Sequence, residues 1–143
     1  MRWSRPLRAG FELLIAWVLL GNASLRLRFC GFQKARSWAE HLSARHKTPL
    51  DPIRADRAIR RAARCLPAVQ CLQRSLALLY WLRTHGHLAQ LRLGVAPGTP
   101  FRAHAWVELD RLALGETALG LRDFTPLDQA NPSSPWPTRS TPS

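Results

Sequence analysis

The fold is decided by the stretch Cys71-Leu72-Gln73-Arg74-Ser75-Leu76-Ala77-Leu78-Leu79-Tyr80-Trp81-Leu82-Arg83-Thr84-His85-Gly86. Its leucines at 72, 76, 79 and 82 recur at the spacing of one helix face. Pro67 ahead of the stretch and Gly86 at its end are typical helix boundaries. The pattern therefore predicts a buried helix whose first residue is Cys71.

Two further helical segments precede this stretch. Asp51-Pro52 is typical of an N-cap followed by proline at the first helical position, and it predicts a helix over 52–64. We expect Ile53, Ile59 and Ala63 to face inward from it. Upstream, apolar residues recur over 11–38 with an interruption near Gly21-Asn22, which predicts two helices or one kinked helix.

Downstream of Gly86 the apolar period changes to two, which is typical of strands. We expect strands over 91–95, 101–109 and 112–119, with a turn at 96–100 and a tight hairpin at Asp110. The predicted fold class is therefore α+β, with N-terminal helices followed by the helix that begins at Cys71, packed on a small antiparallel sheet. We divide the chain into a basic helical segment (1–50), a core (51–124) and a Pro/Ser-rich flexible tail (125–143).

Composition limits the class of protein. The 143 residues are 46% hydrophobic and 21% charged, which suits one folded domain. The net charge of +12 lies mostly in the first half and favours anionic partners. An odd number of cysteines, three, favours a reducing compartment, so we expect a cytoplasmic protein.

The N-terminus resembles a secretory signal because arginines at 2, 5 and 8 precede the apolar run 13–20. Glu12 at the head of that run and the basic residues after it argue against this interpretation. Eight apolar residues are also far fewer than the roughly 20 that span a bilayer. We therefore expect a buried or interfacial helix, with peripheral membrane association as an alternative.

Three residues could together perform nucleophilic catalysis: Cys71, His104 and Glu116. A helix N-terminus stabilises the thiolate of a cysteine, a histidine can act as its base, and an acid orients the histidine. If Asp110 centres the hairpin turn, paired residue numbers sum to 220 and His104 faces Glu116. Asp110 competes for the third role, but six strand residues place it roughly 20 Å from His104.

Other residues admit plainer interpretations. Cys30 and Cys65 are simplest as core thiols, and the spacing of Cys65, Cys71, His85 and His87 fits no usual zinc site, so we expect no metal. Trp81 and Trp106 could wall a substrate cleft or merely pack. A further set could bind an acidic peptide or a partner, or simply form a solvated face: Arg54, Arg57, Arg60 and Arg61.

A family resemblance rests on four segments that occur in order: Cys71-Leu72-Gln73-Arg74-Ser75-Leu76-Ala77-Leu78, Leu82-Arg83-Thr84-His85-Gly86, Leu91-Arg92-Leu93-Gly94-Val95 and Pro100-Phe101-Arg102-Ala103-His104-Ala105-Trp106-Val107-Glu108. Over about 51–119, the chain resembles the leader peptidase of lasso peptide biosynthesis. That family belongs to the transglutaminase-like superfamily of papain-type cysteine enzymes. The resemblance implies a papain/transglutaminase-like core.

The resemblance also implies the site and the reaction. The family's nucleophile falls on Cys71 and its histidine on His104. The third member, usually an aspartate about twelve residues after the histidine, falls on Glu116, which is one methylene longer. The implied reaction is amide hydrolysis between leader and core of a ribosomal precursor peptide, and this reaction needs no metal or nucleotide. The backbone N–H of Cys71 is a candidate oxyanion donor.

The implied partners are the precursor peptide, a separate leader-recognition protein and a cyclase, because the segment before residue 51 is helical and lacks a strand-rich recognition module. The N-terminal helices are candidates for contact with the recognition protein or with a membrane. Two other functions stay open. One is a noncatalytic basic adaptor for nucleic acid or anionic membrane, and the other is acyl transfer by the same cysteine to an amine.

Overall fold

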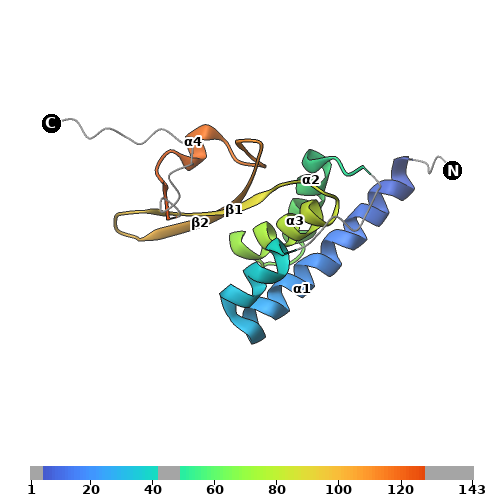
Figure 1. Cartoon of the computed structure of the whole chain (residues 1–143), viewed down its shortest axis with the longest axis horizontal. Helices are drawn as coiled ribbons and strands as arrows, with labels where there is room; N and C mark the ends of the chain where they lie inside the picture. The colour runs from blue at the N-terminus through green and yellow to red at the C-terminus, as the bar shows by residue number, and fades with distance from the viewer. Residues whose placement is uncertain (1–4, 42–48, 128–143) are drawn as a thin grey trace.

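A computed structural model describes residues 5–41 and 49–127 (Figure 1). Three helices come first: α1 (Arg5–Glu40), α2 (Pro52–Arg64) and α3 (Cys71–Thr84). Four strands follow: β1 (Gln90–Ala96), β2 (Arg102–Leu109), β3 (Leu112–Ala113) and β4 (Thr125–Pro126). A short helix, α4 (Ala118–Leu121), lies between β3 and β4. The strands form one antiparallel sheet in the order β3-β2-β1-β4, which confirms the predicted α+β class.

Helix α1 is broken, but not where its sequence suggested. The interruption predicted at Gly21 is wrong, because that glycine continues the helix in open space. The break lies at Gly31, whose φ of 79° and ψ of 170° are non-helical. Figure 1 shows the chain changing direction there and running back beside its first part. Glycine suits this position because it has no Cβ to clash at positive φ.

Helix α2 has the predicted bounds and the predicted cap. The Asp51 side chain accepts a hydrogen bond from the backbone N–H of Ile53 at 3.0 Å, and Pro52 occupies the first turn. Ile59 is buried as expected. The inward orientation expected for Ile53 is wrong, since this residue is 52% exposed, and small side chains fill the interface instead: Ala55, Ala58 and Ala62.

Helix α3 is the centre of the core, and its predicted start at Cys71 is confirmed. It contacts α1, α2 and the sheet, so Leu76, Leu79 and Leu82 are all fully buried. Segment α1 shares this core through Leu20. A buried hydrogen bond of 2.9 Å joins the Ser75 hydroxyl, as donor, to the backbone oxygen of Ala105 on β2. This bond fixes the second turn of α3 against the strand that carries His104.

The hairpin register differs from the prediction by one residue. Leu109 pairs with Leu112 and Glu108 with Ala113, so the numbers of paired residues sum to 221 rather than 220. The turn has two residues, Asp110 and Arg111, both at positive φ. Such a turn matches the twist of a hairpin. The strand expected over 112–119 is also wrong, because β3 ends at Ala113.

The sheet continues beyond the predicted core boundary at residue 124. Thr125 pairs with Val95, and the backbone N–H of Leu127 donates to Leu93 O at 2.8 Å. Thr125 and Pro126 therefore belong to the sheet and not to a tail. The remainder of the predicted tail, from residue 128, lies outside the described residues.

The segment Leu7–Glu40 is long and apolar enough to cross a membrane by length and composition. This is weak evidence, because signal sequences and the core helices of soluble proteins pass the same test. The outward side of α1 carries exposed large apolar residues, which form a stripe at helical spacing: Leu7, Phe11, Leu14, Val18, Leu25 and Phe29. The opposite side, with Ala16, Leu20 and Ala23, is buried in the core.

Candidate active site

Cys71 is the first residue of α3 and is partly buried. Gln70 precedes it as the N-cap, and the Gln73 side chain accepts a hydrogen bond from the Gln70 backbone N–H at 3.0 Å. Backbone N–H groups in the first turn of a helix have no partner within the helix, and the helix dipole places positive charge there. Position 71 therefore suits a thiolate.

Glu116 links His104 to helix α2. Its Oε1 atom lies 3.1 Å from His104 Nε2 and 3.3 Å from the Arg60 Nη2 donor. The Arg60 Nε donates to both oxygens of Asp56, one turn earlier on α2, at 3.0 and 3.1 Å. The side chains of His104 and Glu116 are each only 19% exposed. The Glu116 carboxylate thus contacts both the Arg60 guanidinium and the His104 imidazole at a position with little exposure to solvent.

The contact between His104 and Glu116 was expected from a register that proved wrong. In the observed register Glu116 is beyond the end of β3 and not in a strand. The connection after β3 brings it back to β2, helped by the bond from Glu116 N to Ala113 O. Gly115 permits this path: its φ is +68°, and a Cβ there would overlap the Arg60 guanidinium.

Two aromatic rings flank the imidazole of His104. The Trp106 ring stacks at a centroid distance of 6.0 Å, and the Phe124 ring lies at 5.4 Å. Gly94, the partner of His104 on β1, leaves room for them, because a Cβ there would come within 2.9 Å of Trp106 and 3.1 Å of Phe124. With Nε2 facing Glu116, the rings and the acid limit how the imidazole can rotate.

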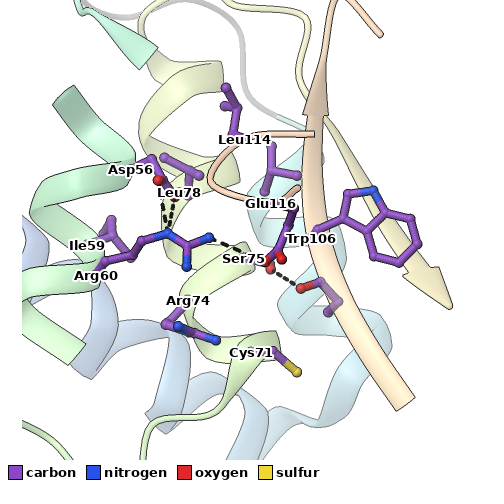
Figure 2. Close-up of a pocket in the computed structure, with 12 residues that line it drawn as sticks. Asp56, Ile59, Arg60, Cys71, Arg74, Ser75, Leu78, Trp106, Leu114 and Glu116 are labelled. Atoms are coloured by element: carbon purple, nitrogen blue, oxygen red, sulfur yellow. Dashed lines mark hydrogen bonds and ion pairs between the residues drawn. The ribbon is translucent and has the colours of Figure 1, made fainter. Parts of the chain in front are cut away.

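Cys71 and Glu116 line one small space (Figure 2). Figure 2 shows the thiol projecting from the start of α3 on the side of β2. The space holds about 20 Å³, which is enough for one water molecule. Arg74, Ser75 and Trp106 also line it. A larger group does not fit such a volume.

The predicted residues are thus brought together in part. Glu116 contacts His104 and shares the small space with Cys71. In the described part of the chain, no hydrogen bond joins the Cys71 sulfur to His104. Asp110 is an exposed turn residue. It lies at the far end of β2 from His104, so the competitor for the third role has no place at this site.

Sequence reasoning missed several residues of this site. Arg60 was grouped with a solvated basic face, yet its guanidinium holds Glu116 and Asp56. The spacing of four between Asp56 and Arg60 was the available signal. The side chain of Arg74, one turn after Cys71, has no hydrogen bond or ion pair among the described residues, and it adds a positive charge to the space that Cys71 lines. Nothing in the sequence indicated Phe124.

The remaining candidates have other roles. Trp81 is 3% exposed and belongs to the core, whereas Trp106 lines the site. The expectation that Cys30 and Cys65 are core thiols is wrong, since both are exposed. All three cysteines are free. Within residues 5–41 and 49–127, no group of three or more His, Cys, Asp or Glu side chains is placed to hold a metal ion.

Comparison with known families gives one match. The family model for the transglutaminase-like superfamily matches residues 16–129. The match begins within α1, reaches past β4, and includes Cys71, His104 and Glu116. No curated protein and no solved structure gives a significant match to the chain.

Proposed function

The chain belongs to the transglutaminase-like superfamily, and on that premise we propose that it is a cysteine peptidase that removes the leader from a ribosomally made lasso peptide precursor. Membership supports cysteine protease or acyltransferase chemistry. The observation that carries the proposal furthest is the 3.1 Å hydrogen bond between His104 Nε2 and Glu116 Oε1, beside a cysteine at a helix start. The segments that resemble the leader peptidase supply the substrate class.

Glu116 and Arg60 prepare the base. The Glu116 carboxylate accepts a hydrogen bond from the His104 Nε2–H, so in the neutral imidazole the lone pair is on Nδ1. That nitrogen is then free to take the thiol proton of Cys71 when a substrate closes the site. Catalytic hydrogen bonds are often absent or long before substrate binds. Arg60 holds the carboxylate in place through the second contact with Glu116.

The proposed reaction has two stages. The Cys71 thiolate attacks the carbonyl carbon of the bond between leader and core, and the resulting oxyanion accepts a hydrogen bond from the Cys71 backbone N–H. The imidazolium of His104 protonates the departing amine as the C–N bond breaks, which leaves a thioester on Cys71. A water molecule, deprotonated by His104, attacks the thioester, releases the carboxylic acid and restores the thiol.

The position of Arg74 favours an anionic intermediate. This guanidinium lines the same small space as Cys71, and it has no carboxylate partner in the described part of the chain. A positive charge one helical turn from the sulfur stabilises both the thiolate and the oxyanion. The same features would serve acyl transfer, in which an amine rather than water resolves the thioester.

The proposed partners are the precursor peptide, a separate leader-recognition protein and a cyclase, in the cytoplasm. Three free cysteines are consistent with a reducing compartment. The exposed apolar stripe of α1 is the proposed contact for the recognition protein, since an uncovered apolar patch of this kind marks interaction sites. Peripheral contact with an anionic membrane through the same stripe is the alternative.

The test compares wild type with Cys71→Ala. Each protein is incubated with the precursor and the recognition protein of the same pathway, and products are identified by mass spectrometry. We expect leader and core fragments from wild type and none from the variant, because the variant has no thiol at the start of α3 to form the thioester. Cleavage that survives Cys71→Ala would contradict the peptidase assignment. A product joined to an added amine would identify acyl transfer instead.

A further inference from the structure

A second cavity lies on the other side of α2 from the candidate active site. It encloses about 450 Å³ between α1 and α2, within the size range of ligand sites in proteins. Helix α1 contributes Leu13 and Trp17, together with Ala9 and Glu12. Helix α2 contributes one face of arginines at helical spacing, followed by a cysteine: Arg54, Arg57, Arg61, Arg64 and Cys65. We refer to this cavity as the arginine groove.

The charge of the arginine groove is not balanced by the protein. Arg54 forms an ion pair with Glu12 at 2.9 Å. Within the described residues, Arg57, Arg61 and Arg64 have neither an ion pair nor a hydrogen bond to a side chain, and all three are exposed. The one carboxylate in the lining, Glu12, is paired with Arg54, so three guanidinium groups lie on one concave surface without a carboxylate partner. Such a surface attracts anions and binds carboxylates by paired hydrogen bonds.

Apart from Glu12, the opposite wall of the arginine groove is apolar. Leu13 is 36% exposed and Trp17 is 43% exposed. The ligand that fits both walls carries several negative charges and an apolar group. A peptide with acidic residues and one apolar side chain has this chemistry. From Arg54 to Arg64 the helix rises about 15 Å, which matches several residues of extended peptide at about 3.3 Å each.

The position of the groove points to the substrate as the source of that peptide. Helix α2 separates the two cavities: Arg60 and Asp56 face the active site, whereas Arg57 and Arg61 face the groove. Cys65, at one end of the groove, precedes Cys71 by six residues, which span at most about 22 Å. A single extended peptide can therefore occupy the groove and place another of its bonds at Cys71.

We propose that the arginine groove is a binding site for an acidic segment of the precursor peptide, which holds the substrate while its scissile bond reaches Cys71. This inference rests on the proposed function for the identity of the substrate. The binding site itself rests on the cavity, the three unpaired guanidinium groups and the apolar wall.

The test measures binding and cleavage separately. A short dye-labelled peptide with alternating glutamates and one leucine is titrated with the full chain, and its fluorescence anisotropy is compared with that of the same peptide with glutamines. The variant Arg57→Glu/Arg61→Glu removes the groove's charge at two exposed positions. The control Arg28→Glu/Arg111→Glu changes net charge equally at exposed positions outside the groove.

We expect wild type and the control to prefer the acidic peptide, and Arg57→Glu/Arg61→Glu to bind it about ten-fold more weakly. Cys71→Ala should bind it normally. Equal weakening in both charge variants would overturn the proposal, because the net charge and not the groove would then bind the peptide. Retained affinity in Arg57→Glu/Arg61→Glu would overturn it as well.

Two further experiments distinguish peptide binding in the groove from lipid binding and from the peptidase assignment. In the first, vesicles that contain phosphatidylserine are titrated with the same proteins. If Arg57→Glu/Arg61→Glu loses vesicle binding but keeps its peptide binding, the groove binds lipid and the proposal is overturned. Precursor cleavage is then measured with both charge variants. If peptide binding fails while Cys71-dependent cleavage persists at the wild-type rate, the groove proposal falls and the peptidase stands. If binding holds while no cleavage occurs, the peptidase assignment falls.

Discussion

At the scale of single residues, the account depends on Glu116, whose carboxylate contacts both His104 and Arg60. Its pairing with His104 was predicted, although from a hairpin register that is one residue out. Glu116 still reaches His104 because the connection after β3 turns back toward β2. The pair of residues could be found from sequence because both are polar side chains near one hairpin. The contact between Arg60 and Glu116 could not, since α2 is distant in sequence from the hairpin.

Glu116→Gln tests whether the negative charge of Glu116 is needed, because glutamine has nearly the same shape but no charge. Glutamine keeps an oxygen near His104 Nε2, but it cannot balance the imidazolium that forms during the reaction. We expect kcat/KM for precursor cleavage to fall by about 10²-fold, as is typical when an acid–base partner is disabled. Asp110→Asn is the matched control, because Asp110 is an exposed turn residue, and its activity should be unchanged. The opposite order of activities would show that Glu116 is not the third member.

At the scale of elements, the helices were more predictable than the sheet. Local signals set the ends of α2 and α3: the Asp51 cap, Pro67 and Gly86. The break in α1 was misplaced because two glycines fit the pattern, and only packing decides between Gly21 and Gly31. The elements β3, α4 and β4 are too short to show a periodic sequence pattern. In addition, β4 is a strand only because it pairs with β1, which is distant in sequence.

Gly115→Ala tests the connection that carries Glu116. An alanine at a φ of +68° costs about 1–2 kcal/mol, and its Cβ also overlaps the Arg60 guanidinium. We expect a lower free energy of unfolding in urea and reduced cleavage, because Arg60 must move away from Glu116. Gly21→Ala is the control, since its Cβ meets nothing within 4 Å in a helix. That variant should gain about 0.5–1 kcal/mol and keep full activity. Equal effects of the two substitutions would contradict the proposed role of Gly115.

At the scale of the whole molecule, α2 organises the surface. One of its faces holds the acid of the candidate active site through Arg60, and the other presents the arginine groove. The net charge of +12 was evident from composition, but composition could not show which arginines are bound internally and which are free. The family match covers residues 16–129, so α1 lies within the matched region from residue 16 onward, although its outward apolar stripe is exposed.

The central claim is that His104 makes the sulfur of Cys71 a nucleophile. Its most direct test is the rate at which iodoacetamide alkylates each cysteine at neutral pH, followed by peptide mass mapping in wild type and His104→Ala. Cys30 and Cys65 are internal references, since both are more exposed than Cys71. We predict that Cys71 reacts about ten-fold faster than Cys30 in wild type, and that His104→Ala removes this advantage without changing Cys30 or Cys65. Slow alkylation of Cys71 in wild type, or a fast rate that survives His104→Ala, would contradict the account.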